Sequence, residues 1–149
     1  MDIGISNGLQ EYFASKWAKK LIGGILVFII LICICGCKHI KLTIRSYPDT
    51  NKGQPVYVMI RSVNAKKFLT DSYQDIADKV FADPPDPSVL DYQAILPGQK
   101  QKIKLKKPDT SVGIYCMFTE PGDEWKIILP RPLNSKYKIE LEKNRIIEK

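Results

Sequence analysis

The apolar run from Leu21 to Cys37, LIGGILVFIILICICGC, constrains this chain more than any other stretch. Apart from its glycines and cysteines the run is wholly apolar, and Lys16, Lys19 and Lys20 stand just before it. A basic flank, an apolar core and small residues at the end are the layout of a secretory signal. The run therefore predicts that the residues after it fold on the far side of a membrane.

The end of this run, Ile34-Cys35-Gly36-Cys37, resembles a bacterial lipobox. In that motif a small residue precedes a cysteine that is lipidated and becomes the mature N-terminus. We therefore expect residues 1–36 to be a signal peptide, residues 37–149 to be the mature domain, and Cys37 to carry a covalent lipid. No other cofactor is expected.

A single-span membrane anchor is the alternative. The 17 residues from Leu21 to Cys37 rise about 25 Å in a helix, against a hydrocarbon core of about 30 Å. The extension Met1–Ser15 is long for a signal and carries Asp2 and Glu11, so a chain that keeps it on the cytoplasmic side also stays open. Lysines flank the run on both sides and do not settle its orientation.

The part after Gly36 is long enough for one domain, and it is basic. It has 113 residues, and it carries +6 of the chain's net charge of +7. That length suits one compact domain and not two. The charge suits an anionic lipid surface or an acidic protein face. Without an arginine-rich run or an aromatic stacking pattern, it does not indicate nucleic acid.

Cysteine and histidine usage argues against most catalytic sites. Cys116 is the only cysteine after the apolar run, so packing and not a disulfide must stabilise the domain. His39 is the only histidine, which excludes the usual serine or cysteine triad. There is no phosphate loop, nucleophile elbow, His-Glu-x-x-His motif or credible zinc cluster. The folded part is therefore interpreted as a binding module and not an enzyme.

Alternation of apolar and polar residues predicts seven or eight short strands. They cover Ile40–Arg45, Pro55–Val63, Val89–Leu96, Gln101–Lys107, Ser111–Phe118, Trp125–Leu129, Lys136–Glu142 and Arg145–Glu148. Pro55–Val63 is apolar on both faces and should be a central strand. Short strands separated by turns indicate an all-β fold, an antiparallel β-sandwich. Cys116 should be buried in it and unreactive.

One amphipathic helix is expected over Thr70–Phe81. Its apolar stripe is formed by Tyr73, Ile76, Ala77 and Val80. Its opposite side, expected to face solvent, carries Asp71, Asp75 and Asp78. Asp71 with Gln74 resembles a capping box that begins the helix.

Two polar stretches allow two interpretations each. The long turn-rich segment Ser46–Pro55 is either a binding loop or a wide turn. Lys102, Lys104 and Lys106 on the exposed side of one strand form either a docking stripe or the protection of a sheet edge, and we favour edge protection.

Taken in order, these features resemble the TssJ (SciN) family, the outer-membrane lipoproteins of bacterial type VI secretion systems. The resemblance is carried by the lipobox cysteine, the turn Asn51-Lys-Gly-Gln-Pro55, the strand that follows it, Phe68 with the helix, the turn Leu96-Pro97-Gly98, the strand Val112–Phe118 and Trp125. It spans nearly all of the mature domain. The long N-terminal extension and the proline-rich segment after the helix depart from the family pattern.

The resemblance implies a transthyretin-like sandwich with a structural role. Family members are tethered to the outer membrane and hold the periplasmic part of the inner-membrane protein TssM, which associates with TssL. Lys38 after the lipidated cysteine also favours outer-membrane sorting over the inner membrane. The loop that contacts TssM corresponds to Ser46–Pro55, so deletion of Asn51–Gly53 is expected to weaken binding and to leave the fold intact. The candidate partner contacts are Tyr47, Asp49, Asn51, Lys52 and Gly53.

A different class of function stays open beside this one. A sandwich anchored by a single span could act as an envelope ligand carrier or as an enzyme. A small molecule bound to the purified domain would favour that reading over the tether.

Overall fold

The computed structural model describes residues 39–80 and 82–149. Cys37, the apolar run and the proposed boundary after Gly36 lie outside the described residues. No helix in the described part of the chain is long and apolar enough to cross a membrane.

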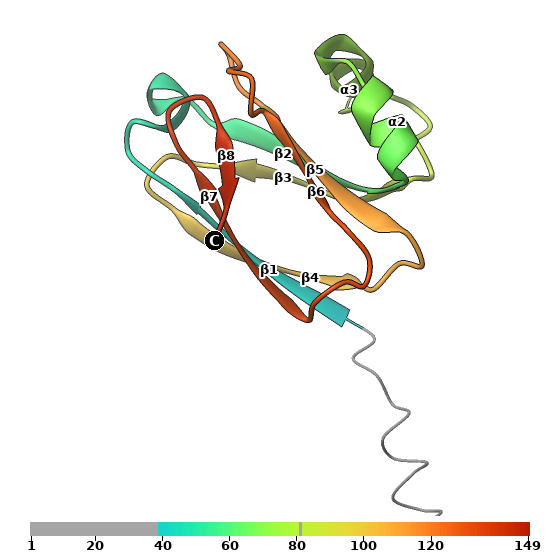
Figure 1. Cartoon of the computed structure of the whole chain (residues 1–149). Coiled ribbons are helices and arrows are strands. Elements are labelled where there is room, and N and C mark those ends of the chain that lie inside the picture. Colours follow the sequence, from blue (N-terminus) through green and yellow to red (C-terminus); the bar gives the residue numbers. More distant parts are fainter. Residues whose placement is uncertain (1–38, 81) are drawn as a thin grey trace, which may run out of the picture. The chain divides into compact units, whose positions relative to one another are not determined.

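The described chain folds into two four-stranded sheets packed face to face (Figure 1). One sheet has the order β4-β1-β7-β8 and the other β3-β2-β5-β6. The strands are β1 (His39–Ser46), β2 (Val56–Val63), β3 (Val89–Ile95), β4 (Lys100–Lys106), β5 (Ser111–Met117), β6 (Lys126–Leu129), β7 (Lys136–Leu141) and β8 (Ile146–Glu148). The predicted β-sandwich is confirmed.

Strand pairing follows from the direction in which each strand crosses the sandwich. Odd-numbered strands run one way and even-numbered strands the other, so most neighbours are antiparallel. The exception among the described strands is β1 with β7, which are parallel because both are odd-numbered. β2 lies between β3 and β5, as its two apolar faces predicted.

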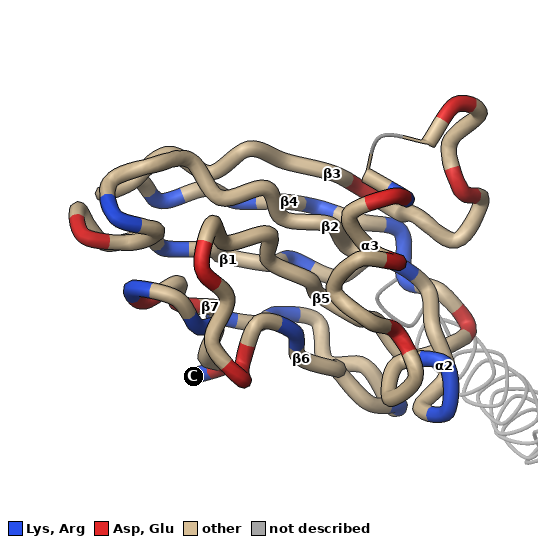
Figure 2. The backbone as a smooth tube through the Cα atoms, turned by 90° about the horizontal axis from the view of Figure 1, so that it is seen from above, with Lys and Arg blue, Asp and Glu red and all other residues tan. Residues whose placement is uncertain are grey.

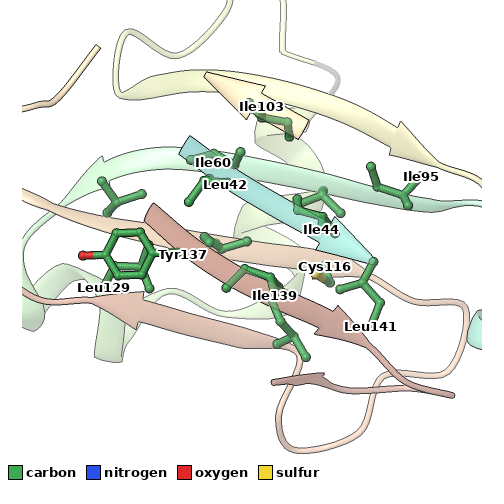
Figure 3. Packing of buried hydrophobic residues seen from close by; sticks show 14 of the residues in the cluster. Leu42, Ile44, Ile60, Ile95, Ile103, Cys116, Leu129, Tyr137, Ile139 and Leu141 are labelled. Carbon is green, nitrogen blue, oxygen red and sulfur yellow. The ribbon is translucent and has the colours of Figure 1, made fainter. Parts of the chain in front are cut away.

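The core lies between the two sheets and takes the inward side chains of every strand (Figure 3). The alternating residues Ile40, Leu42 and Ile44 of β1 are fully buried there. Tyr137, Ile139 and Leu141 of β7 point inward too, as the alternation predicted. Cys116 is buried among them, and burial raises the pKa of its thiol. The expectation of a buried, unreactive cysteine agrees with this position.

Two short helices, not one, cover the outer face of the β3-β2-β5-β6 sheet (Figure 1). They are α2 (Ala65–Thr70) and α3 (Tyr73–Val80). The predicted start was wrong, because the backbone at Asp71 is extended. The capping box forms one residue later: the Ser72 amide donates to Asp75 Oδ2 (3.2 Å), and the Asp75 amide donates to Ser72 Oγ (3.1 Å).

Asp71 corrects a second expectation, since its side chain is buried and not solvated. Arg61 Nη1 lies 3.1 Å from Asp71 Oδ2, and the two side chains are 4% and 1% exposed. The Tyr115 hydroxyl donates to the same oxygen at 2.7 Å. The break between α2 and α3 turns Asp71 toward the sheet, whereas Asp75 and Asp78 stay exposed as predicted.

Candidate functional site

The segment between β1 and β2 folds into a tight turn. It contains the short 3-10 helix η1 (Thr50–Gly53). Asn51, Lys52 and Gly53 have φ angles of 51°, 56° and 78°. Asparagine and glycine tolerate this left-handed conformation better than other residues. The sequence Asn-Lys-Gly therefore fixes a turn that a generic polar loop would not form.

Asn51 holds this turn against the rest of the sandwich. Its side-chain amide donates to Pro55 O (2.8 Å), and its Oδ1 accepts from the Thr119 amide (2.7 Å). Its backbone amide donates to Lys143 O at 2.7 Å. The residue is 4% exposed. Asn51 thus links three loops, and its side chain has no surface left for a partner.

Thr50 adds a second internal link. Its hydroxyl donates to Leu141 O (2.7 Å) and accepts from the Tyr47 amide (2.8 Å). Both contacts are made to the end of β7 or within the loop itself. The backbone of the loop is therefore fixed by buried hydrogen bonds, while its exposed side chains project outward.

Tyr47 belongs to a polar cluster at the rim of the same end. Its hydroxyl donates to Glu140 Oε2 at 2.8 Å, and Lys149 Nζ lies 2.7 Å from the same oxygen. Arg45 lies over the Tyr47 ring, 5.1 Å from its centroid. The hydrogen bonds from Lys149 and Tyr47 lower the pKa of Glu140, and the bond to Glu140 raises the pKa of Tyr47.

Two adjoining hollows of about 560 and 530 Å³ open beside these residues. They share Asp49, Lys143 and Asn144, and we call them together the end groove. The other residues lining it are Tyr47, Pro48, Asn51, Lys52, Gly53, Glu120, Glu142 and Arg145. Lys52 Nζ pairs with Glu120 Oε1 at 2.5 Å across the groove. The end groove is open and mixed in charge, unlike the enclosed, mostly apolar pockets that small ligands prefer.

The loops around the end groove support one another. The Gly122 amide donates to Asn144 O (3.0 Å), and the Ile146 amide donates to Glu124 O (2.8 Å). Arg145 pairs with Glu142 at 2.7 Å. The groove therefore has walls of fixed backbone with exposed charged side chains on them.

The five predicted contact residues all line the end groove, but they differ in availability. Asp49, Lys52 and Gly53 are exposed, and Tyr47 is partly exposed. Asn51 is buried and serves the fold. Deletion of Asn51–Gly53 would remove its hydrogen bonds, so the expectation that this deletion leaves the fold intact does not suit the structure.

Glu120, Lys143, Asn144 and Arg145 were missed as site residues, since the sequence shows them only in turns. These residues could have been found from the order of the strands along the chain. Loops that follow odd-numbered strands all lie at one end of a sandwich whose strands alternate in direction. The β1–β2, β5–β6 and β7–β8 loops therefore meet, as Figure 1 shows at the end opposite the start of β1.

Comparison with protein families gives a match to the model described as IglE, N-terminal domain, over residues 57–141. Comparison with curated protein sequences gives no match.

Solved structures with the same fold come from type VI secretion systems. A chain of a type VI membrane complex is 20% identical, with a TM-score of 0.63, covering 76% of this chain and 99% of that one. A chain of the structure described as the T6SS protein TssM C-terminal domain from EAEC is 20% identical (TM-score 0.61, 75% and 98% covered). The T6SS lipoprotein TssJ1 from Pseudomonas aeruginosa is 12% identical (0.57, 75% and 96%). These matches show the shared fold, and together with the family match they confirm the resemblance to TssJ that the ordered motifs indicated.

Proposed function

Because the chain belongs to the family of the IglE N-terminal domain, we propose that it is a noncatalytic lipoprotein subunit of a type VI secretion membrane complex. In this role it tethers the periplasmic part of a TssM-like inner-membrane protein to the outer membrane, and through it contacts a TssL-like protein indirectly. The family match and the shared fold with a type VI membrane complex and with TssJ1 support the proposal.

The observation that carries the tethering role is the end groove. Its backbone is held by Asn51 and Thr50, so a partner that binds the exposed side chains of Asp49, Lys52 and Lys143 does not have to order the loop backbone that carries them. Preorganised, open and charged surfaces suit a protein partner. The chain with this fold in the structure described as a TssM C-terminal domain supports a TssM-like partner.

The position of the end groove also suits a tether. The groove lies at the end of β1, whereas Cys37 precedes the start of β1 by only two residues. Eight strand residues span roughly 25 Å at about 3.3 Å each. A lipid on Cys37 and a partner in the groove therefore occupy opposite ends of the same strand and do not compete for space.

The noncatalytic assignment is part of the proposal. Cys116, the one thiol in the described residues, is buried with a raised pKa, which disfavours the reactive thiolate. Within residues 39–80 and 82–149 no group of acidic, cysteine and histidine side chains could hold a metal ion.

Charge reversal in the end groove tests the partner. We expect Lys52→Glu with Lys143→Glu to weaken binding of a TssM-like periplasmic domain at least about tenfold, or about 1.4 kcal/mol. Lys66→Glu with Lys106→Glu makes the same change in net charge outside the groove and should leave affinity unchanged. Binding by titration calorimetry measures both, and equal affinities for the two variants would remove the groove from the proposal.

The intact mass of the membrane-extracted protein tests the anchor. Loss of residues 1–36 with added acyl mass, abolished by Cys37→Ser, is the expected result. A full-length, unmodified mass would leave a single-span anchor, and the outer-membrane location would then lose its support.

A further inference from the structure

The outer face of the β4-β1-β7-β8 sheet is strongly basic over three neighbouring strands. We define the basic face by its exposed cations: Lys41 and Arg45 on β1, Lys100, Lys102, Lys104 and Lys106 on β4, and Lys136 and Lys138 on β7. Figure 2 shows such positions in blue along β4, with acidic positions in red on α3. A hollow of about 500 Å³ lies on this face between Lys41, Lys102, Lys104, Lys136 and Lys138.

Edge protection does not account for the basic face. It applies to β4, which is an edge strand, as the favoured interpretation of its lysines required. β1 and β7, however, are interior strands, and they have no free edge to protect. The lysines of these two strands need another reason.

The register of the strands makes this arrangement unfavourable by itself. Lys41 lies directly opposite Lys104 on one side and Lys136 on the other. Like charges at directly opposite positions destabilise a sheet. None of these three lysines has an ion pair among the described residues. The carboxylate of Glu140 lies further along β7, opposite Arg45, and is bound by Lys149.

The cations begin at the start of β1, where the chain enters the sheet, and continue along the strand to Arg45, opposite Lys100. Lys106 lies opposite His39 and Lys136 opposite Lys41, at the start of β1. Cys37 precedes Lys41 by four residues, which reach at most about 14 Å when extended. The basic face therefore begins within a short reach of any membrane that holds Cys37 or the apolar run.

We propose that the basic face docks on the anionic lipid headgroups of the membrane that holds the N-terminal segment. The proposal rests on the membrane attachment in the proposed function, but not on the partner in the end groove. Cations beside an anchor are attracted to an anionic surface, and each strengthens binding by about fivefold. Docked in this way, the sandwich lies along the membrane with α2 and α3 facing away, and the end groove opens to the side.

Lysine acetylation of the full-length chain in vesicles tests this orientation. The chain is incorporated into vesicles of phosphatidylcholine alone and of phosphatidylcholine mixed with phosphatidylglycerol, and each lysine is followed by mass spectrometry. We expect Lys102, Lys104 and Lys138 to react about fivefold more slowly in the anionic vesicles. Lys66 on α2 should react equally in both. At about 1 M salt, where the Debye length is about 3 Å, the difference should vanish.

A matched pair of variants makes the result specific. Lys104→Glu with Lys136→Glu should abolish the protection of Lys102 and Lys138, whereas Lys52→Glu with Lys66→Glu, with the same net charge, should preserve it. Equal reactivity of the basic face in the two vesicle types would overturn the proposal and leave the face to an acidic protein. This assay contains no partner protein, and the titration of the end groove contains no vesicles. A negative result in one experiment therefore leaves the proposal tested by the other unaffected.

Discussion

The two sheets of the sandwich share one core but have opposite outer faces. The outer face of the β3-β2-β5-β6 sheet is covered by α2 and α3 and buries Met59, Val63 and Tyr115. The outer face of the β4-β1-β7-β8 sheet has no such cover among the described residues and carries the basic face. The first sheet is therefore buried on its inner side and beneath the helices on its outer side, where Tyr57 and Tyr92 stay exposed, and the second is buried on one side only.

A positive charge therefore has different consequences on the two faces. On the covered face, Arg61 is buried against Asp71 and Tyr115. Its removal leaves the buried Asp71 carboxylate with the Tyr115 hydroxyl and the more distant, exposed Lys67 Nζ as its remaining partners. On the open face, Lys104 is exposed to solvent, and its removal leaves no buried charge without a partner. We expect the covered face to decide stability and the open face to decide interactions.

The largest expected effect is on the covered face, from Arg61→Leu. It leaves the buried Asp71 without its close cation and with only the exposed Lys67 Nζ, 3.9 Å from Oδ1, which destabilises by about 3 to 5 kcal/mol. Denaturant unfolding at neutral pH measures the loss. The double variant Arg61→Leu with Asp71→Leu should recover most of the lost unfolding free energy, because it no longer contains the buried carboxylate. A loss of unfolding free energy under about 1 kcal/mol in the single variant would show that the buried ion pair of the covered face does not decide stability.

Ile76→Ala tests the helical cover itself. Ile76 of α3 is fully buried against the sheet, so its truncation should cost about 2 to 3 kcal/mol of unfolding free energy. Asp78→Ala, at an exposed position on the same helix, is the matched control and should change stability by less than about 0.5 kcal/mol. A loss for Ile76→Ala no larger than that for Asp78→Ala would show that packing of α3 on the sheet contributes little to stability.

Tyr115→Phe removes the hydroxyl that donates to Asp71, with an expected loss of about 1 to 2 kcal/mol at neutral pH. Burial and the bond to Asp71 raise the pKa of Tyr115 well above its usual value. The unfolded chain therefore loses this proton first, so wild-type stability declines as pH rises above about 10. The decline should be shallower in Tyr115→Phe. Tyr57→Phe, at an exposed position, should show the wild-type profile.

The smallest expected effect lies on the basic face, where the substitution should increase stability instead of decreasing it. Lys41→Thr removes a charge that lies opposite two lysines, so stability should rise by about 0.2 to 0.5 kcal/mol at low salt. Salt should erase the gain, because it screens the repulsion in the wild-type protein. A loss of stability would show that the aliphatic part of Lys41 packs on the sheet.

The sequence was sufficient for most of the strands, because alternation records which side faces the core. Leu42, Ile103 and Ile139, for example, occupy the apolar positions of alternating strands and lie in the core. The structure of the covered face was harder to predict from the sequence. A helical wheel over Thr70–Phe81 assumes one continuous helix, and the extended backbone at Asp71 breaks that assumption. Arg61, directly after the apolar run Val56–Ile60 of the same strand, was the available signal for a buried carboxylate.

The candidate site was predictable in part. The segment Ser46–Pro55 could be singled out by its turn formers, but Lys52 and Glu120 are 68 residues apart and meet only through the strand order. The burial of Asn51 could not be inferred either, because its hydrogen bonds are made with loops from β5 and β7. Local patterns give local structure, and the groove is made by the topology.

The parallel pairing of β1 with β7 has a mechanical consequence. β1 is hydrogen-bonded along its length to β4 on one side and to β7 on the other. When a partner pulls at the end groove in the direction of β1, against an anchor at the start of β1, the force runs along the strand. Two rows of hydrogen bonds then bear the load in shear together, whereas a force across the strand would peel them one at a time. Such a geometry suits a part that must hold under tension.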